Sequence, residues 1–323
     1  MHETFPDSTA SDKFTFVTVI FEGSKSGMIL QARSLAKYLP CDLVEKIILI
    51  DNSANGSSMG WLADLQAAYG DLWGMVSILR ASDIADVSEA GGGWWAQQVL
   101  KLKIAEHIRT SVYVLLDCKH YLVKPMARDF LTRDGKLRIR AANYAGHPLL
   151  PNLKAALSHF GIPDSQATHF PTTTPPFPFA VDAALDVVAY SEKQSGSLKK
   201  FMIDNNITEF FLYSAYLISQ NRLSTLYELH SIPYPVLWPG RTSPNDADEA
   251  IAASRSSESP FFGVHRRAGL AAHKLAREKI AEYLFEAGLV ASQKEGVVRL
   301  LEGKASLVVR GREKIKKLLK RGM

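Results

Sequence analysis

The stretch SVYVLLDCKH, from Ser111 to His120, says most about the fold. Its β-branched and aromatic residues predict a buried strand, and its last four residues are polar or reactive. Segments with helical spacing of apolar residues separate it from three similar stretches: FTFVTVIF (14–21), VEKIILIDNS (44–53) and GMVSILRASDI (74–84). Strands alternating with helices predict an α/β fold in which helices flank a mostly parallel, Rossmann-like sheet.

Acidic residues stand where two of these predicted strands end. Asp51 closes the second strand and is followed by Asn52, while Asp117 closes the fourth. In an open parallel sheet, ligands bind in the crevice beyond the carboxyl ends of the strands. We therefore expect the sheet to bring Asp51 and Asp117 to one binding site. For Asp117 a turn or helix cap is the alternative, because Asp is common where strands stop.

The composition is that of a globular protein, with 323 residues of which 46% are hydrophobic and 22% charged. This length allows one large domain, or one domain with an appendage. No stretch approaches the roughly 20 apolar residues that span a bilayer, and the polar N-terminus does not resemble a secretory signal. Two cysteines far apart predict neither a disulfide framework nor a metal pair with each other, which indicates a reduced, cytoplasmic protein.

Charge and pattern divide the chain into a polar N-terminal tail (1–13), an α/β domain (14–268) and a basic helical C-terminal extension (269–323). The net charge is +5, and the end of the chain alone carries more than this excess. The rest is close to neutral, which does not fit a nucleic-acid-binding surface. The last segment, GREKIKKLLKRGM, predicts an amphipathic helix at an anionic surface such as the inner membrane, or a solvated terminal helix.

The second half of the domain is less regular. FPTTTPPFPFAV (170–181) is rich in Pro and Thr and predicts a loop or an irregular extended segment. NNITEFFLYSAYLIS (205–219) predicts a helix with Thr208 as its N-cap and Glu209 in its first turn. RTSPNDADEAIAASRSSES (241–259) predicts a mobile loop with a short helix.

The side chains around Asp117 allow two kinds of diphosphate site. A strand-end carboxylate can hold a divalent metal that bridges a nucleotide diphosphate, because hard cations prefer oxygen ligands. His120 can add an imidazole ligand or a hydrogen bond to a sugar, although a lone His is more often a surface residue. Lys119 cannot ligate a metal when charged, but it can meet a diphosphate directly, so that the site needs less metal or none. Cys118 is expected to face the opposite side and pack in the core.

Two predicted helices add further candidates. WWAQQVLKLKIA places Gln97 and Lys101 four positions apart on one face, where Lys101 can bind phosphate, although spacing alone favours a solvated lysine. Glu209 lies near a helix N-terminus, where the macrodipole stabilises its charged form. Glu209 is a candidate base or acceptor-binding carboxylate, and the local sequence alone favours a capping role.

A late apolar segment, PFFGVH (260–265), predicts a strand that ends on His265. Arg266 and Arg267 follow it directly. A strand-end His beside two arginines suits a phosphate or metal site, and a solvated basic turn is the alternative.

Taken in order, five segments resemble a bacterial family of GT-A-type glycosyltransferases of surface polysaccharide or lipopolysaccharide assembly: WWAQQVLKL, YVLLDCKHYLVKP, TPPF, TEFFLY and FFGVH. The resemblance covers roughly Phe14 to Arg267, and the order and spacing of the motifs carry it. It implies a GT-A-like fold, a nucleotide-sugar donor and a glycan or glycolipid acceptor.

The resemblance also implies roles for particular positions. Asp51 corresponds to an acid that contacts the nucleoside. Asp117 corresponds to the first acid of the Asp-x-Asp motif that binds a metal (Mn or Mg) and the donor diphosphate, and Lys119 stands at the place of the second acid. Glu209 corresponds to a helix-borne catalytic base or acceptor contact, and His265 to a late His at the metal or diphosphate site.

The chemistry of glycosyl transfer agrees with these assignments. Negative charge develops on the leaving diphosphate, and a metal or basic side chains must offset it. The candidates for this are Lys119, His265, Arg266 and Lys101. An inverting reaction also needs a base for the acceptor hydroxyl, which suits Glu209.

Two other functions remain open. The first is a nucleotidyltransferase on a related sheet, for which FEGSKSG (21–27) is a weak form of the expected Gly-rich basic loop after the first strand. The second is a non-catalytic carbohydrate-binding or scaffold protein that kept the fold and lost the metal. Lys119 is the feature that favours this last alternative.

Overall fold

The computed structural model describes residues 13–53, 60–86, 92–240 and 242–301. Its strands are β1 (Phe14–Ile20), β2 (Val44–Asp51), β3 (Val76–Arg80), β4 (Val112–Leu116), β5 (His120–Leu122), β6 (Thr132–Arg133), β7 (Lys136–Ala142), β8 (Phe170–Pro171), β9 (Phe177–Ala180), β10 (Tyr227–His230), β11 (Val236–Leu237) and β12 (Phe261–Val264). Its α-helices are α1 (Lys25–Tyr38), α2 (Leu62–Tyr69), α3 (Ala81–Ile84), α4 (Gly92–Lys103), α5 (Leu150–His159), α6 (Val181–Ser195), α7 (Leu198–Asp204), α8 (Glu209–Ser219), α9 (Leu223–Leu226), α10 (Pro244–Ser256), α11 (Arg266–Ala271), α12 (Lys274–Glu286) and α13 (Gln293–Leu301). The predicted N-terminal tail and the segment GREKIKKLLKRGM lie outside the described residues.

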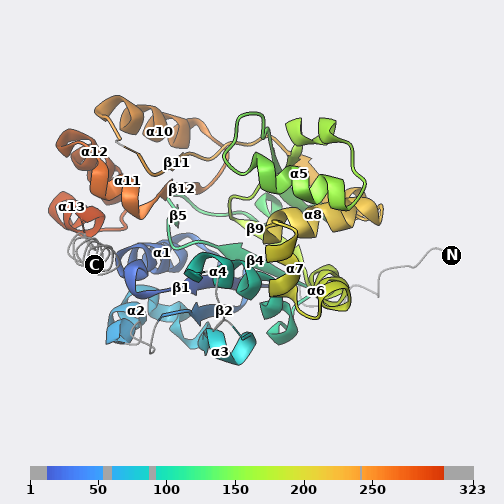
Figure 1. The fold of residues 1–323 in the computed structure, drawn as a ribbon. Helices are drawn as coiled ribbons and strands as arrows, with labels where there is room; N and C mark the ends of the chain where they lie inside the picture. Colours follow the sequence, from blue (N-terminus) through green and yellow to red (C-terminus); the bar gives the residue numbers. More distant parts are fainter. Residues whose placement is uncertain (1–12, 54–59, 87–91, 241, 302–323) are drawn as a thin grey trace, which may run out of the picture.

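The main sheet has the strand order β3-β2-β1-β4-β9 (Figure 1). β1 runs parallel to β2 and β4, and β2 runs parallel to β3, whereas β9 is antiparallel to β4. The register pairs Ile20 with Asp51 and Thr18 with Leu116. The carboxyl ends of β2 and β4 therefore flank the end of β1, and the predicted α/β fold with a mostly parallel sheet is confirmed.

Both faces of this sheet are covered by helices, because side chains alternate along each buried strand. On β1, Val17 belongs to the core cluster that also contains side chains of α4, α6 and α8. Its neighbour Phe16 belongs to the cluster that contains side chains of α1 and α2. The sheet is thus the middle layer of three, which explains why β1 and β4 read as continuous apolar runs.

A small second sheet, β11-β12-β5, continues directly from the end of β4. The turn between β4 and β5 contains Asp117 and Lys119, and the backbone N–H of His120 donates to the carbonyl of Asp117 at 2.9 Å. β12 runs antiparallel to β5, and the N–H of Val264 donates to the carbonyl of Lys119 at 3.0 Å. This pairing brings the late PFFGVH segment, and with it His265, beside the Asp117 turn.

The described part of the C-terminal extension packs on the α/β domain. Leu30 of α1, Tyr121 of β5 and Ile280 of α12 share one core cluster. On α13, the Glu295 carboxylate accepts hydrogen bonds from Arg33 of α1 (2.8 Å), from Arg299 (3.0 Å) and from the backbone N–H of residue 291. Burial raises the pKa of Glu295, but these donors outweigh it and hold the pKa at about 2. None of the described helices has the length and apolar character needed to cross a membrane.

Two sequence-based predictions about local structure are only partly correct. Within the Pro- and Thr-rich segment predicted as a loop or an irregular extended segment, Phe177–Ala180 forms the regular strand β9, because its alternate aromatic residues pack in the core although prolines interrupt the pattern. The polar segment predicted as a mobile loop with a short helix does contain a helix, but α10 is 13 residues long and takes up most of the segment, and Ser243 begins it with a capping box to Asp246. The helix α8 begins at Glu209 after Thr208, as predicted, but the Thr208 side chain forms no capping hydrogen bond.

Candidate functional site

The sheet delivers both predicted strand-end acids to its carboxyl edge. Asp51 is buried at the end of β2, and its Oδ1 accepts a hydrogen bond from the backbone N–H of Ser53 at 2.9 Å. Asn52 follows, and its backbone N–H donates to the carbonyl of Ile20 at the end of β1. Asp117 lies just beyond β4, on the other side of β1. The two acids therefore flank one strand end, as the sequence predicted.

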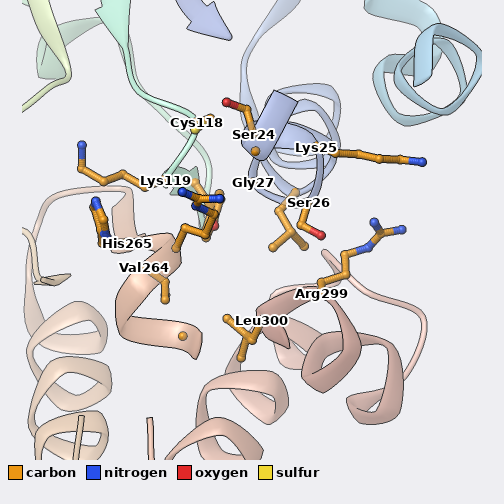
Figure 2. Close-up of a pocket in the computed structure, with 15 residues that line it drawn as sticks. Ser24, Lys25, Ser26, Gly27, Cys118, Lys119, Val264, His265, Arg299 and Leu300 are labelled. Carbon is orange, nitrogen blue, oxygen red and sulfur yellow. The ribbon is translucent and has the colours of Figure 1, made fainter. Parts of the chain in front are cut away.

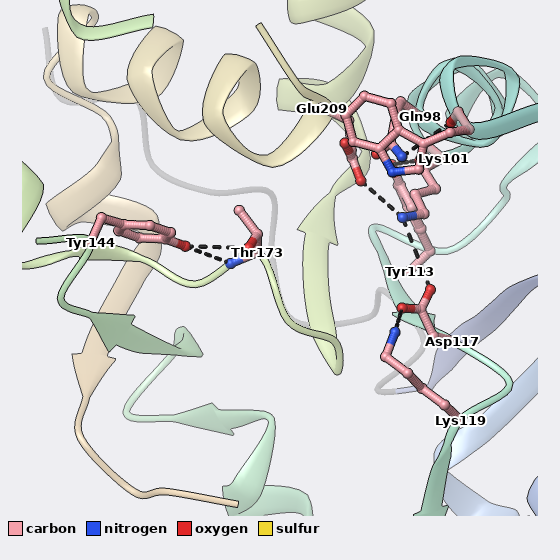
Figure 3. A network of polar contacts seen from close by, with 9 residues as sticks. Gln98, Lys101, Tyr113, Asp117, Lys119, Tyr144, Thr173 and Glu209 are labelled. Atoms are coloured by element: carbon pink, nitrogen blue, oxygen red, sulfur yellow. Dashed lines mark hydrogen bonds and ion pairs between the residues drawn. The ribbon is translucent and has the colours of Figure 1, made fainter. Parts of the chain in front are cut away.

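Asp117 is part of a chain of four charged side chains (Figure 3). Lys101 of α4 donates to Glu209 Oε1 of α8 at 2.9 Å, and the same ammonium lies 3.9 Å from Asp117 Oδ1. The ammonium of Lys119 pairs with Asp117 Oδ2. Lys101 also lies 5.1 Å from the centre of the Phe210 ring. Two cations and two carboxylates thus alternate from the helical layer to the turn after β4.

The charges of this chain shift the pKa values of its members. Burial alone raises the pKa of Asp117, but the charges of Lys119 and Lys101 outweigh it and hold the pKa well below the usual value. Burial lowers the pKa of Lys101, and the charges of Glu209 and Asp117 more than reverse this. For Glu209, burial raises the pKa above the ordinary value, although Lys101 opposes it. Asp117 and Lys101 are therefore held in their charged forms.

The structure corrects two expectations about single residues. Lys101, for which helical spacing favoured a solvated lysine, has only 7% of its surface exposed, because α8 covers α4 and supplies Glu209 as its partner. His120, for which a surface position was the usual expectation, is fully buried, because β12 and Tyr234 cover it. Gln97, predicted to share a face with Lys101, is half-buried, and no contact between it and the charged chain is found among the described residues.

A pocket of about 220 Å³ adjoins this chain at Lys119 (Figure 2). Its wall comes from the segment after β1 that runs into the first turn of α1 (23–27), the turn after β4, the start of α11 and the end of α13. Four cationic side chains line it, and no Asp or Glu among the described residues does: Lys25, Lys119, Arg266 and Arg299. Cys118 also lines this pocket, so the prediction that it packs in the core is only half correct.

Three of these cations, Lys25, Lys119 and Arg299, have carboxylate partners that do not line the pocket. Asp64 pairs with Lys25 at 2.7 Å, and Glu295 pairs with Arg299 at 2.9 Å. Asp117 pairs with Lys119 in the same way. The carboxylates fix the cations, while the wall itself presents positive and neutral groups, which is the arrangement that an anionic ligand requires.

His265 and Arg266 lie at the start of α11, on this wall. The Nδ1 atom of His265 accepts from the backbone N–H of Arg267 at 3.1 Å. Burial first, and then the charges of Lys119 and the two arginines, lower the pKa of His265 to about 4. At neutral pH the ring is therefore neutral with its proton on Nε2, which makes it a hydrogen-bond donor. Arg266 lies 5.6 Å from the Phe21 ring centre.

The glycines of the loop after β1 allow its close approach to these groups. A Cβ atom on Gly27 would stand 2.5 Å from the backbone oxygen of Cys118, and one on Gly23 would stand 2.5 Å from Nη1 of Arg266. Ser24, Lys25 and Ser26 can therefore line the pocket only because the flanking residues, Gly23 and Gly27, lack a side chain. The Ser26 hydroxyl is buried without a hydrogen-bond partner.

The residues predicted to hold a metal do not fit a divalent cation. Both oxygens of Asp117 already face the ammonium groups of Lys119 and Lys101. His265 uses Nδ1 as an acceptor and carries its proton on the other nitrogen. Over the described ranges, no three His, Cys, Asp or Glu side chains gather into a group that could hold a metal. The positive charge of this site comes from lysine and arginine.

Sequence reasoning missed several groups near the site. Arg140 on β7 is half-buried, and Tyr234 is buried beside it with its ring centre 5.6 Å from the guanidinium. Trp238 is half exposed and lies 5.2 Å from the Lys119 ammonium. The segment KLRIRAA carried a signal for Arg140, because Arg138 and Arg140 alternate with buried apolar residues in a strand. No comparable signal marked Tyr234 or Trp238.

Comparisons with known proteins give the following results. Residues 77–236 match the model of DUF6492, a family of unknown function. Comparison with curated proteins gives no match. A crystal structure of the galactosyltransferase LgtC with donor and acceptor sugar analogs is similar over 86% of this chain and 97% of that chain, with 8% sequence identity and a TM-score of 0.47. An active-site mutant of LgtC is similar over 61% and 71%, with 9% identity and a TM-score of 0.40. We therefore derive the function from the side chains themselves.

Proposed function

We propose that this protein is a glycosyltransferase that uses a nucleotide-sugar donor and neutralises the leaving diphosphate with lysine and arginine. The observation that carries the proposal is the pocket at the carboxyl edge of the parallel sheet, whose described wall has four cationic side chains and no acidic one. The order of the sequence motifs, which resembles that of GT-A-type glycosyltransferases, supports the same conclusion. Asp51, at the end of β2, is the proposed contact to the nucleoside.

The proposed roles follow from where charge develops. As the bond between sugar and diphosphate breaks, negative charge grows on the phosphate oxygens. Lys119 and Arg266 meet this charge directly, and His265 donates a hydrogen bond from Nε2. Because these groups are fixed by partners around the pocket, little reorganisation is needed at the moment of reaction.

Asp117, Lys101 and Glu209 have linked roles in this proposal. Asp117 fixes the position of Lys119 beside the pocket through their ion pair. Lys101 fixes Asp117 in turn, and Glu209 fixes Lys101. The Glu209 side chain is 1% exposed, which favours a positioning role over direct contact with an acceptor. Its role as a base stays a prediction from the sequence.

The acceptor is proposed to be a growing glycan or glycolipid of bacterial surface polysaccharide synthesis. We further propose that the basic C-terminal segment binds the anionic inner membrane, where such an acceptor is made. This segment lies outside the described residues, so its sequence alone supports the proposal.

A nucleotidyltransferase is the second candidate. The specific observation in its favour is that the Gly-rich basic loop after β1 lines the pocket, next to Lys119. Such an enzyme attacks the α-phosphate of a nucleoside triphosphate and releases pyrophosphate, whereas the transferase releases a nucleoside diphosphate. The released product therefore separates the two functions.

The test incubates the full chain with a panel of nucleotide sugars, with and without chelator, and assays both products. We expect a nucleoside diphosphate to be released from one donor class, and the release to continue in chelator. Glu209→Gln then separates the two roles of Glu209. A base predicts a fall in kcat with unchanged donor affinity, and a positioning residue predicts losses in both. Pyrophosphate released from nucleoside triphosphates would establish the second candidate, and no turnover with any donor would contradict the transferase.

A further inference from the structure

A second group of polar side chains lies beside Asp117 and has too few partners. Arg140 on β7 is half-buried, and the only hydrogen bond of its guanidinium among the described residues runs from Nη2 to Thr172 Oγ1 at 3.3 Å. Its Nε is buried without a partner. The described residues contain no carboxylate within ion-pair distance of it. A guanidinium has five N–H donors, and most of those of Arg140 are unused.

The neighbouring arginine of the same strand, Arg138, differs from Arg140 in having a carboxylate partner, although the Nε of each has no hydrogen-bond partner among the described residues. Arg138 lies on the same face of β7, two positions earlier. It donates to the carbonyl of Asp129 at 2.7 Å and lies 3.4 Å from the Glu228 carboxylate. Buried charges are normally paired in this way, because an unpaired one is costly. Arginines on this face of β7 can thus find a carboxylate partner, and Arg140 differs because no described carboxylate lies near it.

Two further polar groups without partners stand next to Arg140. Its guanidinium carbon lies 5.6 Å from the centre of the Tyr234 ring, and the buried Tyr234 hydroxyl has no hydrogen-bond partner in the part of the chain that the structure describes. His120 meets the same ring edge-on at 5.6 Å, is fully buried, and has no partner from the described ranges at either ring nitrogen. Buried polar groups almost always find partners, so three neighbouring exceptions call for a ligand.

This cluster adjoins the proposed site of glycosyl transfer. The backbone N–H of His120 donates to the carbonyl of Asp117 at 2.9 Å. The charges of Asp117 and Arg140 both act on the Tyr234 hydroxyl, the first raising and the second lowering its pKa, in addition to the larger effect of burial. Tyr234 thus feels the charge of both residues, and its ring connects Arg140, at 5.6 Å, to His120, at 5.6 Å, which follows the Asp117 turn.

We propose that Arg140, together with Tyr234 and His120, forms a subsite for an anionic group, a carboxylate or a phosphate, carried by the sugar that the enzyme transfers or extends. This inference rests on the proposed function. The planar fork of a guanidinium matches the paired oxygens of either group, and the Tyr234 hydroxyl and a ring nitrogen of His120 supply further donors. A neutral sugar would leave the Arg140 charge without a counter-ion, so the subsite selects acidic sugars.

The test measures the binding of glucuronate, glucose 6-phosphate and glucose to the full chain by calorimetry. One or both acidic sugars should bind more tightly than glucose, and which of them does so identifies the group. Arg140→Gln should remove this preference, a loss on the order of 10- to 100-fold for a charge-assisted contact. Arg133→Gln, which removes the same charge from an exposed side chain on β6, should keep it. Tyr234→Phe, a smaller change, should weaken acidic sugars and leave glucose unaffected.

Two results would overturn the subsite: equal binding of all three sugars to the wild type, or an undiminished preference in a folded Arg140→Gln variant. Glucose 6-phosphate can also enter the cationic pocket, so the measurement is repeated in Lys119→Met, where the Arg140-dependent preference should persist. Nucleotide binding, measured in parallel, tests the proposed function separately. An Arg140-dependent preference without any nucleotide binding would keep the subsite and reject the transferase.

Discussion

Removing the Lys101 ammonium should be far more destabilising than removing a surface lysine. In Lys101→Met the side chain keeps much of its apolar volume, but Glu209 loses its donor. That carboxylate is 1% exposed, lies 2.9 Å from the ammonium, and has no partner at its other oxygen among the residues that the structure describes. Leaving a buried charge uncompensated costs about 3–5 kcal/mol. Glu209→Gln should lower the free energy of unfolding by only about 1–2 kcal/mol, because the Lys101 ammonium still has the Asp117 carboxylate as a partner at 3.9 Å.

The assay is urea unfolding followed by tryptophan fluorescence, with the midpoint and slope fitted for each variant. Lys103→Met is the matched control on the same helix. Lys103 pairs with Glu106 and Glu192, whose side chains are 40% and 41% exposed, so its loss should cost less than about 1 kcal/mol. The double variant Lys101→Met, Glu209→Gln removes both charges and should cost about 2 kcal/mol less than the sum of the single changes. A Lys101→Met variant as stable as the control would refute the buried pair.

Two further predictions concern the rim of the pocket. The folded pKa of Glu295, about 2, lies below its ordinary value of 4.5, so its pairing stabilises the protein at neutral pH and is lost as the pH falls from 4.5 toward 2. Glu295→Gln should therefore lower the free energy of unfolding at pH 7 by about 1 kcal/mol, which thermal unfolding shows as a lower Tm. The difference from the wild type should shrink at low pH, and a difference that stays constant with pH would contradict this. Gly27→Ala should destabilise the protein and weaken nucleotide binding, because the new Cβ meets the Cys118 carbonyl oxygen at 2.5 Å. Gly74→Ala is the control: its Cβ meets no described atom within 4 Å, so both stability and nucleotide binding should stay nearly unchanged.

The strand-end rule explains why part of the site could be predicted from the sequence. Asp51 and Asp117 each follow a continuous apolar run, and parallel strands place such residues at one edge. The sequence also grouped Lys119, His265 and Arg266 correctly, although it could not show how they meet. The antiparallel pairing of β12 with β5, which brings them together, joins segments more than a hundred residues apart.

Other parts of the site depend on contacts that no local pattern reveals. Lys101 has the spacing of a solvated residue, and only the packing of α8 on α4 buries it. Arg140 stands out because no described carboxylate pairs with it, and this can be recognised only once the neighbouring side chains are placed. For β9, the prolines of FPTTTPPFPFAV hid an aromatic strand whose order comes from packing against β4.

The central claim is that lysine and arginine in the pocket bind a nucleotide diphosphate. The most direct measurement is the affinity of nucleoside diphosphates in the presence of chelator, for the wild type, Lys119→Met and the control Lys124→Met. Lys124 contacts the carbonyl of Ser257 and does not line the pocket. The account predicts that at least one nucleoside diphosphate binds, that Lys119→Met weakens it about 10- to 100-fold, and that the control does not. The claim would be contradicted if no nucleotide bound, or if Lys119→Met bound as tightly as the wild type.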